Sequence, residues 1–485
     1  MILFARTAAA QVYDVISVFN HNDGSGPSAA LIQGTDGNLY GTTTYGGAKG
    51  LGTVFKIDLS GPTLTTLHTF ASTDGANPTG RLIQGLDGDL YGTTVLGGAN
   101  AAGTIFRMGT GGGHFTTIHS FVSTEGAYPY SGLIQGPDGF LYGTTYEGGA
   151  NTAGMIYKIR PGGGGFTVLH NFAYADGAFP YAGLILGTDG KLYGTTVEGG
   201  ADGVGTLYQM DTNGKTLTNI YHFDTTHGSD PYGGLIQATD GYLYGTTTFG
   251  GSYGVGTIFK VHTGGAGFVV LHYFGNGTGA QPYAGLLQGT DGNLYGTATY
   301  GGSLDLGTVF KFDIANDTAV VLHEFSGTEG SYSTAGLLQA SNGNFYGVAT
   351  SGGSGAAGVV FGIVQTCFTD VQPSDPFSAF ICKITQDGIA AGCGGGKYCP
   401  DDPVTRAQMA VFLLRAEHGS SYTPPACTPP GTFADVPCPG GFAVDWVEQL
   451  STEGVTAGCG GGNYCPDDAS SRGQMAVFLV KTFGL

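Results

Sequence analysis

Charged residues are scarce in this 485-residue sequence, in which Asp, Glu, Lys and Arg together account for 11% of the positions. The 17 Lys and Arg are outnumbered by 36 Asp and Glu, which gives a formal net charge of -19. Since few cations are present to neutralise phosphates, we expect no nucleic-acid partner. The sequence also lacks any run of about 18 apolar residues, so it predicts no transmembrane segment.

Cysteine is absent from the first 366 residues, because all eight cysteines lie between Cys367 and Cys465. This abrupt change divides the chain near residue 366. Neither the phosphate-binding loop nor the HExxH zinc motif occurs in the sequence. These motifs therefore give no support for catalysis.

What the sequence does contain is glycine, with 92 residues, alongside 41% hydrophobic and 12% aromatic residues. The stretch from Leu31 to Gly47, LIQGTDGNLYGTTTYGG, occurs seven times with small variations. Its Tyr-Gly pair recurs every 51 residues, at Tyr40, Tyr91, Tyr142, Tyr193, Tyr244, Tyr295 and Tyr346. A fixed period of this length without insertions indicates one structural unit repeated around a ring or along a stack.

Each unit reads as four β-strands, which in the third copy are expected at residues 132–136, 141–145, 155–159 and 166–172. The first two strands are separated by Asp138-Gly139, a pair that suits a tight hairpin because glycine accepts positive φ without a steric penalty. β-Branched and aromatic residues are enriched between such turns, as is typical of strands. The repeats are therefore predicted to be all-β.

The N-terminal segment supplies a strand that the last repeat lacks. Phe19 lies 51 residues before Phe70 and opens the series of phenylalanines that end each fourth strand, whereas the seventh copy has no fourth strand. Pairing of Ile16–Phe19 with Val359–Val364 would close a ring and remove the exposed edges of an open stack. We predict a seven-bladed β-propeller over residues 13–365, closed by the N-terminal strand.

Residues 1–12, MILFARTAAAQV, carry one arginine, a brief apolar run and three alanines. This pattern resembles the end of a signal peptide with its small-residue cleavage site. We interpret these residues as a signal-peptide remnant or a leader, and we expect the protein to be secreted.

In a propeller of this kind the second-to-third and blade-to-blade loops open on one face, and here these loops are the longer ones. Loops on a rigid scaffold usually carry function, so we place the binding site on this long-loop face. Seven tyrosines in these loops are the candidate ligand-binding residues: Tyr45, Tyr130, Tyr146, Tyr181, Tyr232, Tyr283 and Tyr300. They could stack on sugars or grip a peptide, or they could instead pack between adjacent blades.

Carboxylates on the same face suggest two further hypotheses. Glu147 and Glu198 share one loop position in neighbouring blades and are the best-placed pair for general acid and base catalysis. A ring of acidic residues could hold a cation such as Ca²⁺, although Asp-Gly is also ordinary turn chemistry. The acidic members of this ring are Asp23, Asp74, Glu125, Asp176 and Glu329. No cofactor is predicted otherwise.

Five histidines recur on the fourth strands, at His68, His119, His170, His272 and His323. Fourth strands lie roughly 14 Å outside the first strands, so these side chains cannot converge on one metal. In the third copy His170 would alternate in phase with Val168 and Phe172. We expect each histidine to lie between blades with a hydrogen-bond partner.

The repeated phrase GLIQGTDGNLYGTT, followed by YGG and GTVFK, resembles the GloVer tandem repeat of bacterial choice-of-anchor proteins. The resemblance covers about residues 13–365. It implies a secreted or surface protein with a variable C-terminal attachment module, and it implies no established enzyme activity.

The cysteine-rich segment, residues 366–485, consists of two related halves. Each half contains an FxDV motif, a GCGGGxYCP motif and then an expected amphipathic helix, at Thr405–Glu417 and Ser471–Phe483. An even cysteine count in an exported module reads as disulfides, with zinc as the alternative. The expected pairs are Cys393–Cys399, Cys459–Cys465, Cys427–Cys438 and Cys367–Cys382.

This segment resembles tandem S-layer homology (SLH) domains, in copies at residues 366–418 and 427–485. That family attaches proteins non-covalently to cell-wall polymers. The resemblance maps its binding motif to Thr405, Arg406, Gln408, Ser471, Arg472 and Gln474. Arginine suits this role because it makes bidentate bonds with anionic groups. The alternative is that these residues only form a helix N-terminus.

The leading functional hypothesis is a non-enzymatic protein of the cell envelope. Its propeller would bind a carbohydrate or protein ligand, and its SLH-like repeats would attach it to a cell-wall or envelope polysaccharide. The alternative is a propeller hydrolase or lyase that acts on a polysaccharide.

Overall fold

The computed structural model describes residues 10–275, 277–366, 381, 397–399, 403–418, 422–429, 431–436, 438, 443–452, 462–464, 466 and 469–471. The chain divides into two compact units. The first spans Tyr13–Ile363, and the second holds the C-terminal residues from Val364 onward.

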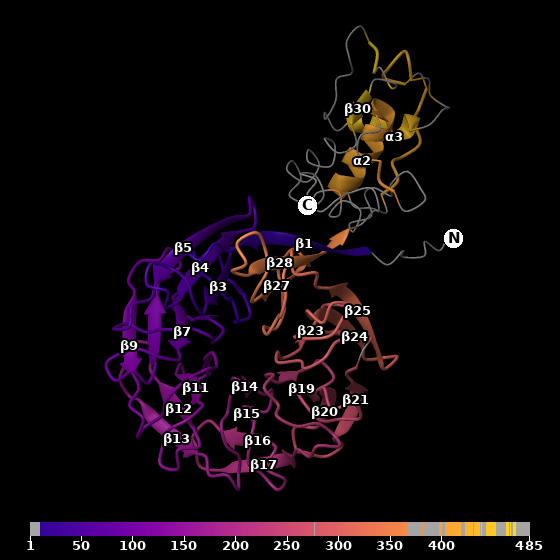
Figure 1. The fold of residues 1–485 in the computed structure, drawn as a ribbon. Helices are drawn as coiled ribbons and strands as arrows, with labels where there is room; N and C mark the ends of the chain where they lie inside the picture. Colours follow the sequence, from indigo (N-terminus) through magenta and orange to yellow (C-terminus); the bar gives the residue numbers. More distant parts are fainter. Residues whose placement is uncertain are drawn as a thin grey trace. The chain divides into compact units, whose positions relative to one another are not determined.

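The first unit consists of seven four-stranded sheets, the blades, which follow one another around a ring (Figure 1). The innermost strands of blades 1 to 7 are β2 (Ile32–Gln33), β6 (Ile83–Gln84), β10 (Ile134–Gln135), β14 (Ile185–Leu186), β18 (Ile236–Gln237), β22 (Leu287–Gln288) and β26 (Leu338–Gln339). The second strands are β3 (Leu39–Thr43), β7 (Leu90–Thr94), β11 (Leu141–Thr145), β15 (Lys191–Thr196), β19 (Leu243–Thr247), β23 (Leu294–Ala298) and β27 (Phe345–Ala349). The predicted seven-bladed propeller is confirmed.

The outer half of each blade is formed by longer strands. The third strands are β4 (Thr53–Asp58), β8 (Thr104–Met108), β12 (Met155–Ile159), β16 (Thr206–Asp211), β20 (Thr257–Val261), β24 (Thr308–Asp313) and β28 (Val359–Thr366). The fourth strands are β5 (Thr63–Thr69), β9 (Thr116–Ser120), β13 (Thr167–Asn171), β17 (Leu217–His222), β21 (Val269–Tyr273) and β25 (Thr318–Glu324). In blade 7 the fourth strand is β1 (Ala10–Val18).

The strand β1 closes the ring, as the position of Phe19 predicts. It lies beside β28, and Figure 1 shows the indigo β1 alongside the orange β28. At the end of β1 the backbone N–H of Phe19 donates a hydrogen bond of 3.0 Å to the carbonyl of Gly358. The other six blades repeat this bond at 3.0 Å, from Phe70 to Gly52 through Phe325 to Gly307.

The same phenylalanine also joins each blade to the next. Phe19, which is fully buried, meets the ring of Phe55 edge to face with a centroid distance of 5.0 Å. The six other junctions have an equivalent aromatic pair, at 5.2 to 5.4 Å. The junction between blades 7 and 1 is therefore built like the six junctions inside the chain.

The repeated Tyr-Gly pair has a packing role on the second strand. Tyr40 is buried and its hydroxyl donates a 2.6 Å hydrogen bond to Asp36 in the first hairpin turn. A Cβ atom on Gly41 would lie 2.6 Å from the Phe55 ring, so only glycine leaves room for that ring. The repeated Tyr-Gly pair thus supplies both the hydrogen bond to the hairpin turn and the space for the aromatic pair between blades.

Glutamines on the innermost strands link neighbouring blades. The backbone N–H of Thr35 donates to Oε1 of Gln84 in the next blade at 2.9 Å. Five further junctions have the same bond, including the one from Ser341 to Gln33 that crosses the closure. Between blades 3 and 4 the donor position is Pro137, which has no N–H, and the acceptor position is Leu186. Both partners of this bond are thus replaced together.

The second unit contains helices α2 (Arg406–His418) and α3 (Val444–Thr452), and short strands β29 (Pro403–Thr405) and β30 (Ala469–Ser471). Leu413 and Leu414 of α2 share a buried cluster with Val447 and Leu450 of α3. The first predicted helix, Thr405–Glu417, is observed one residue later at each end. The second, Ser471–Phe483, lies outside the described residues except for Ser471, which belongs to β30.

We expect Phe19→Ala to lower the free energy of unfolding of the propeller by about 3–5 kcal/mol, because it removes a fully buried ring from the closing junction. Phe172→Ala, at the equivalent position inside the chain, is the matched control and should cost a similar amount. Denaturant unfolding followed by the tyrosine near-UV signal measures both. A small loss for Phe19→Ala beside a large one for Phe172→Ala would contradict closure by β1.

We also expect the double variant Pro137→Thr with Leu186→Gln to be more stable than the sum of the single variants by about 0.5–1.5 kcal/mol, because it installs the missing hydrogen bond. The single variants supply only a donor or only an acceptor. A double-mutant cycle from urea denaturation measures the coupling. A coupling free energy of zero would mean that these glutamine bonds do not stabilise the ring.

Candidate functional site

A cavity of about 610 Å³ lies at the centre of the propeller. Equivalent residues of all seven blades line it, namely Ser28, Thr79, Tyr130, Tyr181, Tyr232, Tyr283 and Thr334. Ile83 and Ile134, on the innermost strands, form part of its wall. The cavity therefore lies on the axis of the ring, and residues of the blade-to-blade loops surround its long-loop end.

Four of the predicted tyrosines, Tyr130, Tyr181, Tyr232 and Tyr283, form a continuous row that we call the tyrosine arc. Tyr130 stacks on Tyr181 with a centroid distance of 4.9 Å, and Tyr181 meets Tyr232 edge to face at 5.0 Å. Tyr232 and Tyr283 follow at 5.2 Å. Small residues hold the same position in the other three blades. The arc thus lines one side of the cavity, and at the equivalent positions smaller side chains line the other side.

The hydroxyls of the tyrosine arc are unlike those of the Tyr-Gly tyrosines. Six of the latter donate to a hairpin aspartate at 2.6 to 2.9 Å. No hydroxyl of the arc makes a hydrogen bond within the described part of the chain. Desolvation, with a smaller contribution from neighbouring tyrosines, raises the pKa of Tyr181 to about 12. These phenols are therefore neutral and free to donate or accept hydrogen bonds.

The other three predicted tyrosines lie in different surroundings. Tyr146 extends the arc, because its ring meets Tyr130 edge to face at 5.3 Å. Tyr300 lines the cavity and approaches Tyr332 at 5.5 Å. Tyr45 is 57% exposed and is not part of the cavity lining.

Sequence reasoning missed the residue that comes two positions before each arc position. Six of these residues have a left-handed backbone with φ between 52° and 58°, namely Asn77, Tyr128, Phe179, Asp230, Gln281 and Tyr332. Each is fixed by its N–H, which donates to the preceding blade, as Tyr128 does to Ala102 at 3.0 Å. Such backbone strain clusters at functional sites. These positions could have been noticed in the sequence, because their side chains differ from blade to blade while the flanking residues repeat.

Glu147 and Glu198 are exposed on the long-loop face and do not line the cavity. Their backbones pair with Ala127 and Ala178, which fixes the loops that carry them. Together with the dominant effect of desolvation, both carboxylates raise the pKa of Tyr146. The structure therefore places the pair beside the aromatic rim and outside the cavity.

The acidic residues of the predicted cation ring lie against fourth-strand histidines. Nε2 of His170 lies 3.1 Å from Oδ2 of Asp176, and three equivalent pairs have distances of 3.0 to 3.3 Å. Asp23 instead accepts a hydrogen bond from Asn20. Among the described residues no group of three or more His, Cys, Asp or Glu could hold a metal. Four of these carboxylates thus each lie next to a histidine, in separate pairs around the ring.

The predicted phase of the fourth-strand histidines is wrong with respect to Val168. Val168 pairs with Tyr157 but His170 pairs with Ile156, so a β-bulge places one extra residue between them. His170 therefore faces the side of the blade opposite to Val168. Burial lowers the pKa of His119, and the nearby Glu125 opposes this shift.

In the second unit, the short strands that contain Thr405 and Ser471, the first residue of each SLH-like motif copy, pair with each other. Pro403 pairs with Ser471 and Thr405 pairs with Ala469 in the β29–β30 ladder. Arg406 then begins α2, and Gln408 is exposed on this helix. Arg472 and Gln474 lie outside the described residues.

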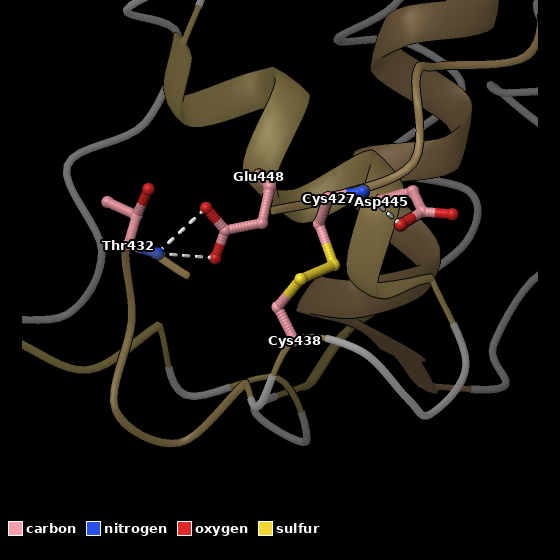
Figure 2. The surroundings of a disulfide bond; sticks show 5 residues. All are labelled: Cys427, Thr432, Cys438, Asp445 and Glu448. Carbon is pink, nitrogen blue, oxygen red and sulfur yellow. Dashed lines mark hydrogen bonds between the residues drawn. A yellow bond between two sulfur atoms is a disulfide. The ribbon is translucent and has the colours of Figure 1, made fainter. Parts of the chain in front are cut away.

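One predicted disulfide, Cys427–Cys438, is confirmed (Figure 2). The helix α3 supports it: the carboxylate of Asp445 accepts a 2.8 Å bond from the N–H of Cys427, and Glu448 accepts from the N–H of Thr432 (Figure 2). Cys399 is also disulfide-bonded. The remaining five cysteines of the predicted pairs, Cys367, Cys382, Cys393, Cys459 and Cys465, lie outside the described residues.

Comparison with known families identifies both parts of the chain. Residues 2–188 and 135–361 match the Gloeobacter/Verrucomicrobia repeat. The chain belongs to this repeat family. Residues 368–410 match the S-layer homology domain. The resemblance predicted from the repeat is confirmed, and so is the S-layer homology resemblance of the first FxDV half; the second copy stays a prediction.

A curated relative, a cell surface protein of Thermoanaerobacter kivui, is 29% identical over 119 residues, which are 24% of this chain and 16% of the relative. The chain thus matches only a small part of that protein. Together with the S-layer homology match, this similarity indicates an extracellular protein attached to the cell surface. No helix in the described part of the chain is long and apolar enough to cross a membrane.

Several solved structures are similar to this chain at low identity. An oligogalacturonate lyase in complex with manganese is 12% identical with a TM-score of 0.48, over 74% of this chain and 98% of that one. The nidogen/laminin complex contains a chain that is 16% identical with a TM-score of 0.39, over 56% of this chain and 91% of that one. Neither similarity bears on function.

Proposed function

We propose that this Gloeobacter/Verrucomicrobia repeat protein binds a carbohydrate in the central cavity of its propeller, and that its S-layer homology repeats attach it to a cell-wall polysaccharide. The propeller would act as a binding module without catalysis. The ligand would enter from the long-loop face, where the tyrosine arc lies.

The single observation that supports this proposal is the row of tyrosines with unpartnered hydroxyls beside a cavity of about 610 Å³. Aromatic faces offer an apolar surface for the C–H side of a sugar ring, and phenol hydroxyls can bond its hydroxyls. A concave site of this volume suits a small ligand or a glycan end better than a flat protein surface. These features favour a carbohydrate over a protein ligand.

The polysaccharide hydrolase or lyase is less well supported. Glu147 and Glu198 lie beside the aromatic rim but outside the cavity lining. General acid and base groups must reach the reacting atoms within hydrogen-bond distance. Product analysis after incubation of any bound glycan tests this alternative directly, since turnover would show catalysis.

Attachment through the second unit is supported by the pairing of β29 with β30, which brings the start of both SLH-like motifs side by side. An arginine in such a motif can bind an anionic cell-wall polymer through two parallel hydrogen bonds. We therefore assign Arg406 and Arg472 to polymer binding.

Glycans that bind on a glycan array should bind Tyr181→Ala about thirtyfold more weakly, because a central aromatic anchor contributes about 2 kcal/mol. Tyr181→Phe should lose less, since it keeps the ring and removes only the hydroxyl. Tyr253→Ala, which removes a tyrosine that is 71% exposed and lies outside the cavity, is the control. Equal loss in Tyr181→Ala and Tyr253→Ala would contradict the assignment of the site.

The double variant Arg406→Ala with Arg472→Ala should lose most of its co-sedimentation with purified cell walls, because it removes both proposed anion-binding groups. Lys49→Ala with Lys215→Ala changes the net charge equally on the exposed propeller surface and should sediment like the unaltered chain. Retention of the arginine variant at the wild-type level would reject polymer binding by this motif.

A further inference from the structure

One residue of the cavity wall breaks the repeat. The position two residues after the tyrosine arc is alanine or glycine in six blades and arginine only in blade 2. The seven residues are Ala30, Arg81, Gly132, Gly183, Gly234, Gly285 and Gly336. Arg81 is the only one of them with a long side chain.

The glycines at this level bring neighbouring backbones close together. A Cβ atom on Gly285 would lie 2.6 Å from the carbonyl oxygen of Gly234, and one on Gly336 would lie 3.2 Å from that of Gly285. A side chain at Gly285 would therefore collide with its neighbour and one at Gly336 would be tightly packed, whereas nothing lies within 4 Å of a Cβ atom on Gly234. The ring leaves room for a side chain at position 81, at the level just inside the tyrosine arc.

The guanidinium of Arg81 is unpartnered within the described part of the chain. It makes no hydrogen bond, ion pair or cation–π contact with any residue that the structure describes. No Asp or Glu lines the cavity, although the chain carries a net charge of -19. The side chain reaches the water of the cavity, yet the surrounding protein desolvates it and lowers its pKa. An arginine nevertheless stays protonated.

A guanidinium that is exposed to the cavity and makes no ion pair with the described residues is available to pair with an anionic ligand. A guanidinium presents a planar fork of donors that matches the two oxygens of a carboxylate and also fits a sulfate. Neutral phenols on the tyrosine arc do not compete for this charge. The cavity thus offers an apolar stacking face at its rim and one anion-binding group just inside.

We propose that the cavity recognises an acidic saccharide, whose anionic group pairs with Arg81 while its sugar rings stack on the tyrosine arc. This inference rests on the proposed function, because it names the class of carbohydrate that the same site binds. The anionic group is the carboxylate of a uronic acid or the sulfate of a sulfated sugar.

Isothermal titration of the full chain tests the proposal with three matched probes: a uronic-acid oligosaccharide, its carboxyl-reduced neutral form and a sulfated oligosaccharide of the same length. Arg81→Gln should weaken binding of the acidic probe about 10- to 150-fold and leave the neutral probe unchanged. The affinity of Arg81→Lys for the acidic probe should lie between those of Arg81→Gln and the unaltered chain, since lysine keeps the charge but lacks the planar guanidinium donors. Arg160→Gln, at an exposed arginine outside the cavity, should bind like the unaltered chain.

The outcomes separate the two proposals. Equal affinity of the unaltered chain for neutral and acidic probes, with no effect of Arg81→Gln, would overturn the acidic-saccharide proposal and leave carbohydrate binding intact. Binding of none of the probes, with capture of peptides instead, would overturn both. The midpoint of thermal unfolding of Arg81→Gln should not fall, because the guanidinium makes no hydrogen bond or ion pair with the described residues; a large fall would assign Arg81 a structural role.

Discussion

The pairing of β1 with β28 is the constraint on which the propeller depends. It turns a chain of identical units into a ring, because the strand at the amino-terminal end supplies the outer edge of the seventh blade. The closing junction has a phenylalanine, a 3.0 Å backbone hydrogen bond and an aromatic pair equivalent to those of the six continuous junctions. Only a closed ring brings the innermost strands of all seven blades to one cavity.

Repetition and variation have different roles in this chain. Tyr40, Gly41 and Phe55, with their equivalents, form the buried scaffold and hardly change from blade to blade. The residues that differ between blades line the cavity. Thr79 in one blade is replaced by Tyr181 at the equivalent position of another, and Arg81 is replaced by Gly132. Where the scaffold does change, it changes in pairs, as at Pro137 and Leu186. Comparison of the seven repeats therefore distinguishes the positions that the fold constrains from those that can vary.

Most of the fold could be predicted from the sequence, because a period of 51 residues and a missing fourth strand leave few arrangements. The side of the blade that His170 faces could not be predicted, because simple alternation of side chains along a strand does not reveal a β-bulge. The sequence also could not show whether the tyrosines of the arc pack between blades or line a cavity. Their 51-residue spacing is the same in both cases. Arg81 escaped notice because a single arginine in a glycine-rich repeat gives no periodic signal, and only the ring brings it to the axis. In the second unit, the even cysteine count allowed the Cys427–Cys438 disulfide to be predicted, and its two cysteines lie 11 residues apart.

Amide hydrogen exchange of the segment 13–19, compared with the fourth strand of blade 3 at 167–171, tests ring closure most directly. Amides whose hydrogen bonds open only on global unfolding share the same protection. The account predicts that both segments exchange at the same slow rate, with protection that reports unfolding of the whole propeller. Rapid exchange of 13–19 beside a protected 167–171 would show that β1 is not part of a closed ring.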